Sequence, residues 1–106
     1  MDTITSSGET TTLKLDRDVV AANCGELREQ LRQILASGSR ALVLDFSEVR
    51  MVDSAGLGML IAAHNSFSRS QGEISVTNCS PEIIELFRSM RLHQHMKIEG
   101  TGLENE

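Results

Sequence analysis

The sequence predicts an α/β protein in which a mainly parallel central sheet has helices packed on it. Segments with the alternating apolar pattern of strands take turns along the chain with segments whose apolar residues recur at helical spacing. Strands that alternate with helices are joined by right-handed crossovers and pair in parallel. The length of 106 residues, with 40% hydrophobic and 24% charged residues, fits a single domain with a modest core.

Within this length we expect three regions. Residues 1–9 are polar and rich in Ser and Thr, which predicts a flexible N-terminal segment or a loose edge strand. Residues 10–99 form the domain itself, and residues 100–106 are expected to be a polar C-terminal tail.

The first half of the domain contains two predicted strands and one helix. Residues 10–15 alternate between apolar and polar side chains, as in a half-buried strand, and residues 19–20 can add a short strand. Asn23 is the expected N-cap of a helix that runs to about residue 36, and Gly38 is expected to end it. The apolar stripe of this helix consists of Leu27, Leu31, Ile34 and Leu35.

The second half continues this alternation. Residues 41–44 form a continuous apolar run, which is expected of a strand covered on both faces. The elements predicted after it are a helix from residue 55 to about residue 70, a strand over 73–77, a helix that begins at Ser80 and Pro81, and a last short strand over 96–99. The residues expected to line the third helix are Ile83, Leu86, Phe87 and Met90.

The turn before the central helix carries the residues best suited to a site. Asp53 and Ser54 can accept hydrogen bonds from the N–H groups that are free at a helix start. Gly56 and Gly58 lie in the first turn, where each costs about 1 kcal/mol relative to Ala, and this indicates a close approach to the backbone. The turn therefore offers a serine hydroxyl at the positive end of a helix, where a phosphate or a partner protein can bind.

The helix behind this turn has one predicted buried face. Its members are Leu57, Leu60, Ile61, His64 and Phe67. Met59 is expected on the exposed side of this stripe, partly buried and able to act as an adaptable contact residue.

Charge and composition argue against several classes of function. The formal charge of -5 does not suit nucleic acid, which needs clustered Lys and Arg, and no apolar run is long enough to cross a bilayer. Cys24 and Cys79 lack metal-ligand spacing and are expected to be free, buried thiols in a reducing cytoplasm. His93 and His95 have no Cys or carboxylate at ligand spacing beside them, so surface histidines are favoured over a metal site and no cofactor is predicted.

The stretch from Asp45 to Leu60 resembles the signature of STAS domains, the family named for sulfate transporters and anti-sigma factor antagonists. The likeness is strongest in the pattern Asp-Ser-x-Gly-Leu-Gly over residues 53–58, and it extends over about residues 10–98. Stand-alone members bind an anti-sigma factor that is also a serine kinase, and so release the sigma factor. Phosphorylation of the Ser that follows the Asp inactivates them, and a metal-dependent serine phosphatase reverses it. The resemblance thus implies an anti-sigma factor antagonist, located in the cytoplasm, with Ser54 as its phosphorylation site.

The same resemblance implies a partner-binding surface around Ser54. Its expected members are Asp53, Ala55, Gly56, Leu57, Gly58 and Met59. One departure from the family pattern is that Val20 occupies the place of an acid that many members carry after the first strand, while Asp18 is out of register. Weak self-association is left open.

Two other functions stand as alternatives. A non-switching scaffold subunit of a transporter or signalling complex is compatible with the departure at Val20. An enzyme with Ser54 as nucleophile is disfavoured, because a nucleophile elbow needs Gly at the position of Val52. In addition, His64 lies nearly three helical turns along the helix from Ser54. The prediction is therefore a binding module and not an enzyme.

Overall fold

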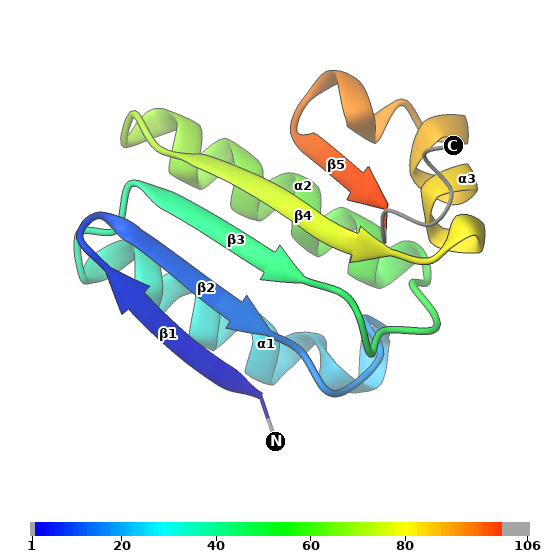
Figure 1. The fold of residues 1–106 in the computed structure, drawn as a ribbon, viewed down its shortest axis with the longest axis horizontal. Coiled ribbons are helices and arrows are strands. Elements are labelled where there is room, and N and C mark those ends of the chain that lie inside the picture. Colours follow the sequence, from blue (N-terminus) through cyan, green and yellow to red (C-terminus); the bar gives the residue numbers. More distant parts are fainter. Residues whose placement is uncertain (1, 101–106) are drawn as a thin grey trace.

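A five-stranded sheet forms the centre of the protein in the computed structural model, which describes residues 2–100 (Figure 1). The strands lie side by side in the order in which they follow in the sequence. They are β1 (Thr3–Ser7), β2 (Thr10–Lys14), β3 (Ala41–Asp45), β4 (Glu73–Cys79) and β5 (Lys97–Gly100). The β1–β2 pair is antiparallel and the other pairs are parallel, which confirms the predicted mainly parallel sheet.

Helices return the chain from each parallel strand to the next. They are α1 (Ala21–Ala36), α2 (Ser54–Arg69) and α3 (Pro81–Ser89), followed by a short 3-10 helix, η1 (Leu92–Gln94). The first two, α1 and α2, pack side by side on one face of the sheet (Figure 1). Each starts beyond the carboxyl end of a strand, so the starts of α1 and α2 lie at the same end of the sheet.

The core lies between the sheet and these helices, and the opposite face of the sheet has no helix over it (Figure 1). In β3, Leu42 and Leu44 are buried, whereas Ala41 and Val43 on the other face are only half-buried. The expectation that this strand is covered on both faces is therefore wrong. Its apolar run is continuous because Ala and Val are tolerated on a half-exposed face, whereas β4 has Glu73 and Ser75 at the corresponding positions.

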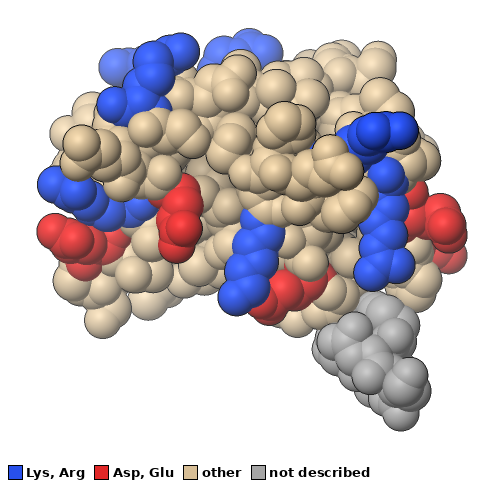
Figure 2. Space-filling view, turned by 90° about the horizontal axis from the view of Figure 1, so that it is seen from above, with Lys and Arg blue, Asp and Glu red and all other residues tan. Residues whose placement is uncertain are grey.

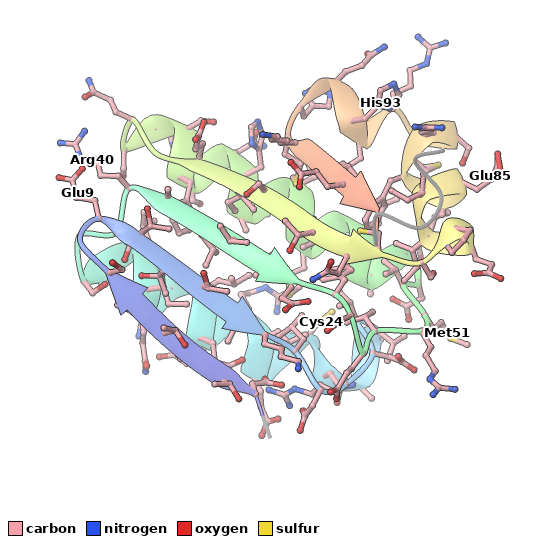
Figure 3. The ribbon with its side chains drawn as sticks, viewed as in Figure 1. Glu9, Cys24, Arg40, Met51, Glu85 and His93 are labelled. Atoms are coloured by element: carbon pink, nitrogen blue, oxygen red, sulfur yellow. The ribbon has the colours of Figure 1, made fainter. Side chains whose placement is uncertain are left out.

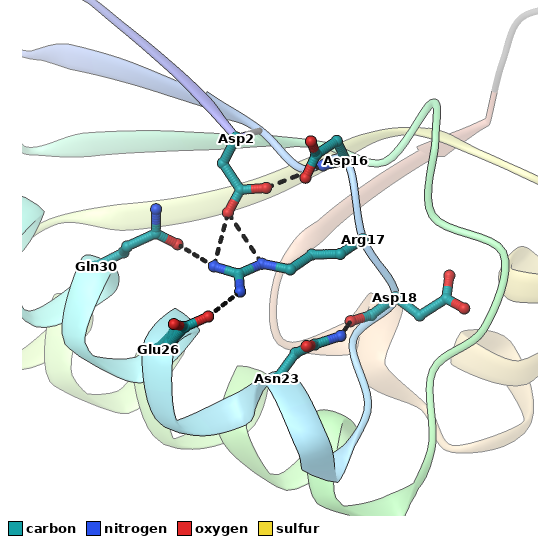
Figure 4. A network of polar contacts seen from close by, with 7 residues as sticks. All are labelled: Asp2, Asp16, Arg17, Asp18, Asn23, Glu26 and Gln30. Carbon is teal, nitrogen blue, oxygen red and sulfur yellow. Dashed lines mark hydrogen bonds and ion pairs between the residues drawn. The ribbon is translucent and has the colours of Figure 1, made fainter.

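The N-terminal segment takes the second of the two forms that the sequence left open, an edge strand. An ion-pair network ties it to the rest of the molecule (Figure 4). The guanidinium of Arg17 donates to the Asp2 carboxylate over 3.2 and 2.9 Å, to Glu26 and, over 3.4 Å, to Gln30. The Asp2 carboxylate also accepts from the Asp16 N–H over 3.0 Å. At the other end of the chain, Gly100 belongs to β5, and the predicted tail at 101–106 lies outside the described residues.

Two predicted helix features differ in the structure. Helix α1 begins three residues early, with Val20 as an N-cap that has no side-chain bond, and Asn23 instead donates to the Asp18 carbonyl over 2.8 Å. In α3, Ser80 and Pro81 start the helix as expected, but Met90 is exposed because the helix ends before it. The expected end of α1 is confirmed, since Gly38 has a left-handed backbone with a φ of 94°.

Candidate functional site

The Asp-Ser turn lies at the carboxyl end of the parallel strands, between β3 and α2. A loop of residues 46–53 leads to it, and Met51 projects outward from this loop (Figure 3). Val52 forms a parallel bridge with Val19, confirming a short strand contact there, and Val19 N–H donates to the Met51 carbonyl over 3.0 Å. The turn is therefore fixed directly against the segment that enters α1.

Asp53 closes the starts of two helices at once. As the N-cap of α2, it accepts a hydrogen bond from Gly56 N–H on Oδ1 over 2.8 Å. Its Oδ2 accepts from Ala21 N–H, the first residue of α1, over 3.0 Å. These donors, Gly56 first and then Ala21, lower the pKa of the Asp53 carboxyl, because they stabilise its charged form. The carboxylate is thus ionised at neutral pH and is committed to holding the turn.

Two further carboxylates hold the loop that carries the turn. Asp18 Oδ1 accepts from the backbone N–H groups of Arg50, over 2.8 Å, and Met51, over 3.2 Å. Asp45 Oδ1 accepts from Ser47 N–H, over 2.9 Å, and from the Asn78 side chain, over 3.0 Å. Burial alone would raise the pKa of Asp45, but these hydrogen bonds outweigh it and the pKa is lowered. The loop is therefore fixed at both ends.

Ser54 is the first residue of α2, and its side chain is exposed. Because Asp53 provides the cap, the Ser54 hydroxyl is not used for it and forms no hydrogen bond with any residue in 2–100. Ala55 is exposed beside it. The hydroxyl lies at the positive dipole end of α2, an environment that tolerates added negative charge.

The two glycines of the turn differ in their surroundings. A Cβ at Gly56 would lie 2.0 Å from the carbonyl oxygen of Val19, so this glycine allows α2 to pack against the segment before α1. A Cβ at Gly58 would meet nothing within 4 Å, and the residue is exposed. Packing therefore explains Gly56 but leaves Gly58 without an intramolecular reason.

The expected partner-contact residues divide into exposed and buried ones. Leu57 and Met59 are 7% and 4% exposed, while Ile61 is 40% exposed. The expectation that Met59 lies on the exposed side of the stripe and Ile61 on the buried side is therefore wrong. Helix α2 packs against α1 as well as the sheet, so its buried face is turned toward Met59.

The structure also brings together two histidines that the sequence did not connect. His64 in α2 and His95 after η1 have ring centroids 6.1 Å apart, and the buried Nδ1 of His64 has no hydrogen-bond partner among the described residues. No group of three or more His, Cys, Asp or Glu within residues 2–100 is arranged to hold a metal ion. Cys24 and Cys79 are buried and form no disulfide within residues 2–100, as predicted. The sequence also gave no sign that Asp18 holds the loop, because its donors lie more than 30 residues away.

Charged side chains form no single large patch on the face of the molecule drawn in Figure 2. Figure 2 shows acidic and basic side chains in separate small groups among uncharged residues on one face of the molecule. Within residues 2–100 no helix is both long and apolar enough to span a membrane.

With this geometry established, comparison with known proteins identifies the family. The family model described as "Mlab, STAS domain" matches residues 3–100. The chain belongs to the STAS domain family. A STAS-domain containing protein of Pseudomonas aeruginosa strain UCBPP-PA14 is 32% identical over 59 residues, covering 56% of this chain and 58% of that protein. The anti-sigma-B factor antagonist of Staphylococcus aureus is 29% identical over 80 residues, covering 74% of each chain.

Solved structures of STAS proteins share the fold. The anti-sigma factor antagonist SpoIIAA in its unphosphorylated form superposes with a TM-score of 0.72 at 15% identity, covering 92% of this chain and 86% of that one. Its phosphorylated form gives a TM-score of 0.71 at 17% identity, covering 92% and 90%. At this identity the likeness concerns the fold, and it confirms the predicted α/β STAS architecture.

Proposed function

We propose that this STAS domain is an anti-sigma factor antagonist that is switched by phosphorylation of Ser54. One observation carries the proposal: an exposed hydroxyl with no hydrogen-bond partner among residues 2–100, held at a helix start whose cap is already provided by Asp53. The names of the Staphylococcus relative and of SpoIIAA support the same class of function. The binding partner is then an anti-sigma factor with serine kinase activity, and a metal-dependent serine phosphatase restores the active form in the cytoplasm.

The switch follows from electrostatics at the helix start. A phosphoserine carries about -1.5 to -2 charges at neutral pH. The dipole and free N–H groups of α2 accommodate this charge within the domain, so the fold survives. A partner surface shaped for a neutral hydroxyl meets like charge and a desolvation cost. A penalty of roughly 3 kcal/mol would weaken binding more than a hundredfold.

The partner surface centres on the exposed residues Ser54, Ala55 and Gly58. The other expected contact residues support this surface, because they cap or pack the first turns of α2. They are Asp53, Gly56, Leu57 and Met59. Val20, which occupies the place of the acid in the family pattern, forms no side-chain hydrogen bond. Asp18, two residues earlier, supports the loop before the turn by accepting from Arg50 N–H.

A phosphorylation assay tests the proposal. The protein is incubated with ATP and the serine kinase encoded beside its gene, and the modified residue is mapped by mass spectrometry. We expect modification at Ser54 that is absent in Ser54→Ala and unchanged in Ser68→Ala, an exposed serine of the same helix. Ser54→Asp is expected to retain the wild-type circular dichroism spectrum and to lose partner binding. Binding of Ser54→Asp with wild-type affinity would contradict the charge-repulsion mechanism.

The non-switching scaffold is the alternative that this assay distinguishes. A scaffold would bind its partner without being phosphorylated, and Ser54→Asp would leave the complex intact. Hydrolysis of a generic ester that disappears in Ser54→Ala would instead revive the nucleophile hypothesis.

A further inference from the structure

A shallow apolar groove runs between α1 and α2, on the side of the helices away from the sheet. Its volume is about 210 Å³. Leu31 and Leu35 line it from α1, and Met59 and Phe67 from α2. Ala62, which is exposed, forms the α2 rim of this groove. The small side chain at Ala62 leaves the groove open to a side chain from outside.

Charge at the groove is basic, in a protein with an acidic balance of 15 Asp and Glu against 10 Lys and Arg. Arg28 and Arg32 stand on the α1 rim, and none of the residues that line the groove is acidic. Arg32 is paired with Glu29, whereas Arg28 has no hydrogen bond or ion pair within residues 2–100. Helix α2 contributes no acidic residue along its whole length. The groove therefore favours an occupant that combines an apolar side chain with carboxylates.

The groove lies close to the proposed switch on the same helix. Ser54, Gly58 and Ala62 are four residues apart and exposed, so they follow one another along one side of α2. The rise of the helix places Ala62 about 12 Å from Ser54 along the axis. A protein that covers Ser54 and Gly58 can therefore reach the groove without leaving the helix surface.

We propose that this groove is a second anchoring point for the partner protein, which inserts an apolar side chain flanked by carboxylates. The inference rests on the proposed function and deepens it, because it names the chemistry of the partner segment. The carboxylates bind Arg28 when Ser54 is bare.

Matched variants test this anchoring point. Ala62→Trp fills the groove, and Ser68→Trp places the same side chain on an exposed site of α2 outside it. Arg28→Glu reverses the rim charge, and Arg88→Glu makes the same change on α3. The affinity of each variant for the kinase that phosphorylates Ser54 is measured by calorimetry. We expect Ala62→Trp and Arg28→Glu to weaken binding about tenfold or more, and both controls to bind like wild type.

The possible failures are distinguishable. If Ser54→Asp abolishes binding but Ala62→Trp and Arg28→Glu bind like wild type, the groove proposal is overturned and the switch stands. If wild type forms no complex with the kinase, both are overturned. Two further results would assign the groove to another occupant and also overturn the proposal. The first is saturable binding of decanoate at groove residues in NMR spectra, while the variants bind the kinase like wild type. The second is a dimer in sedimentation that Ala62→Trp abolishes.

Discussion

Asp53 and Ser54 are neighbours in the sequence with separate tasks in the structure. The carboxylate of Asp53 is fully engaged by two backbone donors, from Gly56 and Ala21, whereas the hydroxyl of Ser54 is free. Sequence reasoning foresaw that either residue could cap the helix, but the side-chain geometry that divides these tasks depends on α1, whose start lies 32 residues earlier. The aspartate therefore belongs to the fold, and the serine is available for recognition.

Replacing the two glycines by Ala is expected to have opposite effects on stability. Gly56→Ala forces a Cβ against the Val19 carbonyl and should destabilise the protein by about 1–3 kcal/mol or more, as overpacking does. Gly58→Ala meets no neighbouring atom and should stabilise it by about 0.5–1 kcal/mol. Urea unfolding followed by circular dichroism measures both changes. Equal effects of the two substitutions would contradict the distinction drawn between packing and access.

Asp53 is also expected to contribute to acid sensitivity. Because its pKa is lowered in the folded protein, its contribution to stability is present above the unfolded value, near 3.9, and is lost as the pH falls through the folded pKa. In Asp53→Asn we expect a lower thermal midpoint at neutral pH and a smaller decrease between about pH 5 and pH 2 than in wild type. Glu85→Gln removes an exposed carboxylate from α3 as the control. An unchanged acid dependence in Asp53→Asn would show that the cap adds nothing to it.

At the scale of elements, the loop of residues 46–53 matters as much as the helix that follows it. Helices and strands were predictable because their apolar periodicity is local, and the short strand expected at residues 19–20 appears as a one-residue bridge between Val19 and Val52. The hydrogen bonds from Arg50 and Met51 to Asp18 were not predictable, since no local pattern connects residues so far apart. Likewise, the exposure of Ile61 and the burial of Met59 depend on where α1 packs.

Removal of the Asp18 carboxylate is expected to loosen this loop. Asp18→Ala leaves the N–H groups of Arg50 and Met51 without their acceptor, so their hydrogen exchange should accelerate and stability should fall by about 1 kcal/mol. Glu48→Ala serves as the control, because its ion pair with Lys14 is 3.6 Å long and exposed, and such pairs contribute little. If Glu48→Ala had the larger effect on exchange at residues 50–51, Asp18 would not be the residue that fixes the loop.

For the molecule as a whole, the parallel direction of β2 to β5 was predictable from the alternation of strands and helices, whereas their order in the sheet was not predicted. The sequence did not determine whether residues 3–7 join the sheet, because their mostly polar side chains, and Ile4 with them, are all exposed and give no burial signal. What attaches them is backbone pairing to β2 together with Arg17, whose three side-chain partners are Asp2 beside β1 and Glu26 and Gln30 on α1. The sequence also predicted that β3 is covered on both faces, which is wrong, because the continuous apolar run does not show that helices pack on one face only and leave the strand half-buried on the other.

Arg17→Leu is expected to release the N-terminal strand selectively. The Asp2 carboxylate, 4% exposed in its side chain, would lose its ion pair, and stability should fall by about 1–3 kcal/mol. Amide exchange in residues 3–7 should increase while that in α2 stays as in wild type. Arg32→Leu, which removes an exposed arginine paired only within α1, should leave exchange in β1 unchanged. Uniform acceleration across the protein in Arg17→Leu would mean that this network stabilises the global fold instead.

Because Asp53 accepts hydrogen bonds from the starts of both α1 and α2, an Asp-Ser pattern in another sequence has to be interpreted differently at its two positions. A chain that folds with these two helix starts against one another needs an acceptor at the first position whether or not any enzyme ever modifies the second. The Asp of such a pattern then indicates how the two helix starts pack, and only the Ser hydroxyl bears on regulation by phosphorylation.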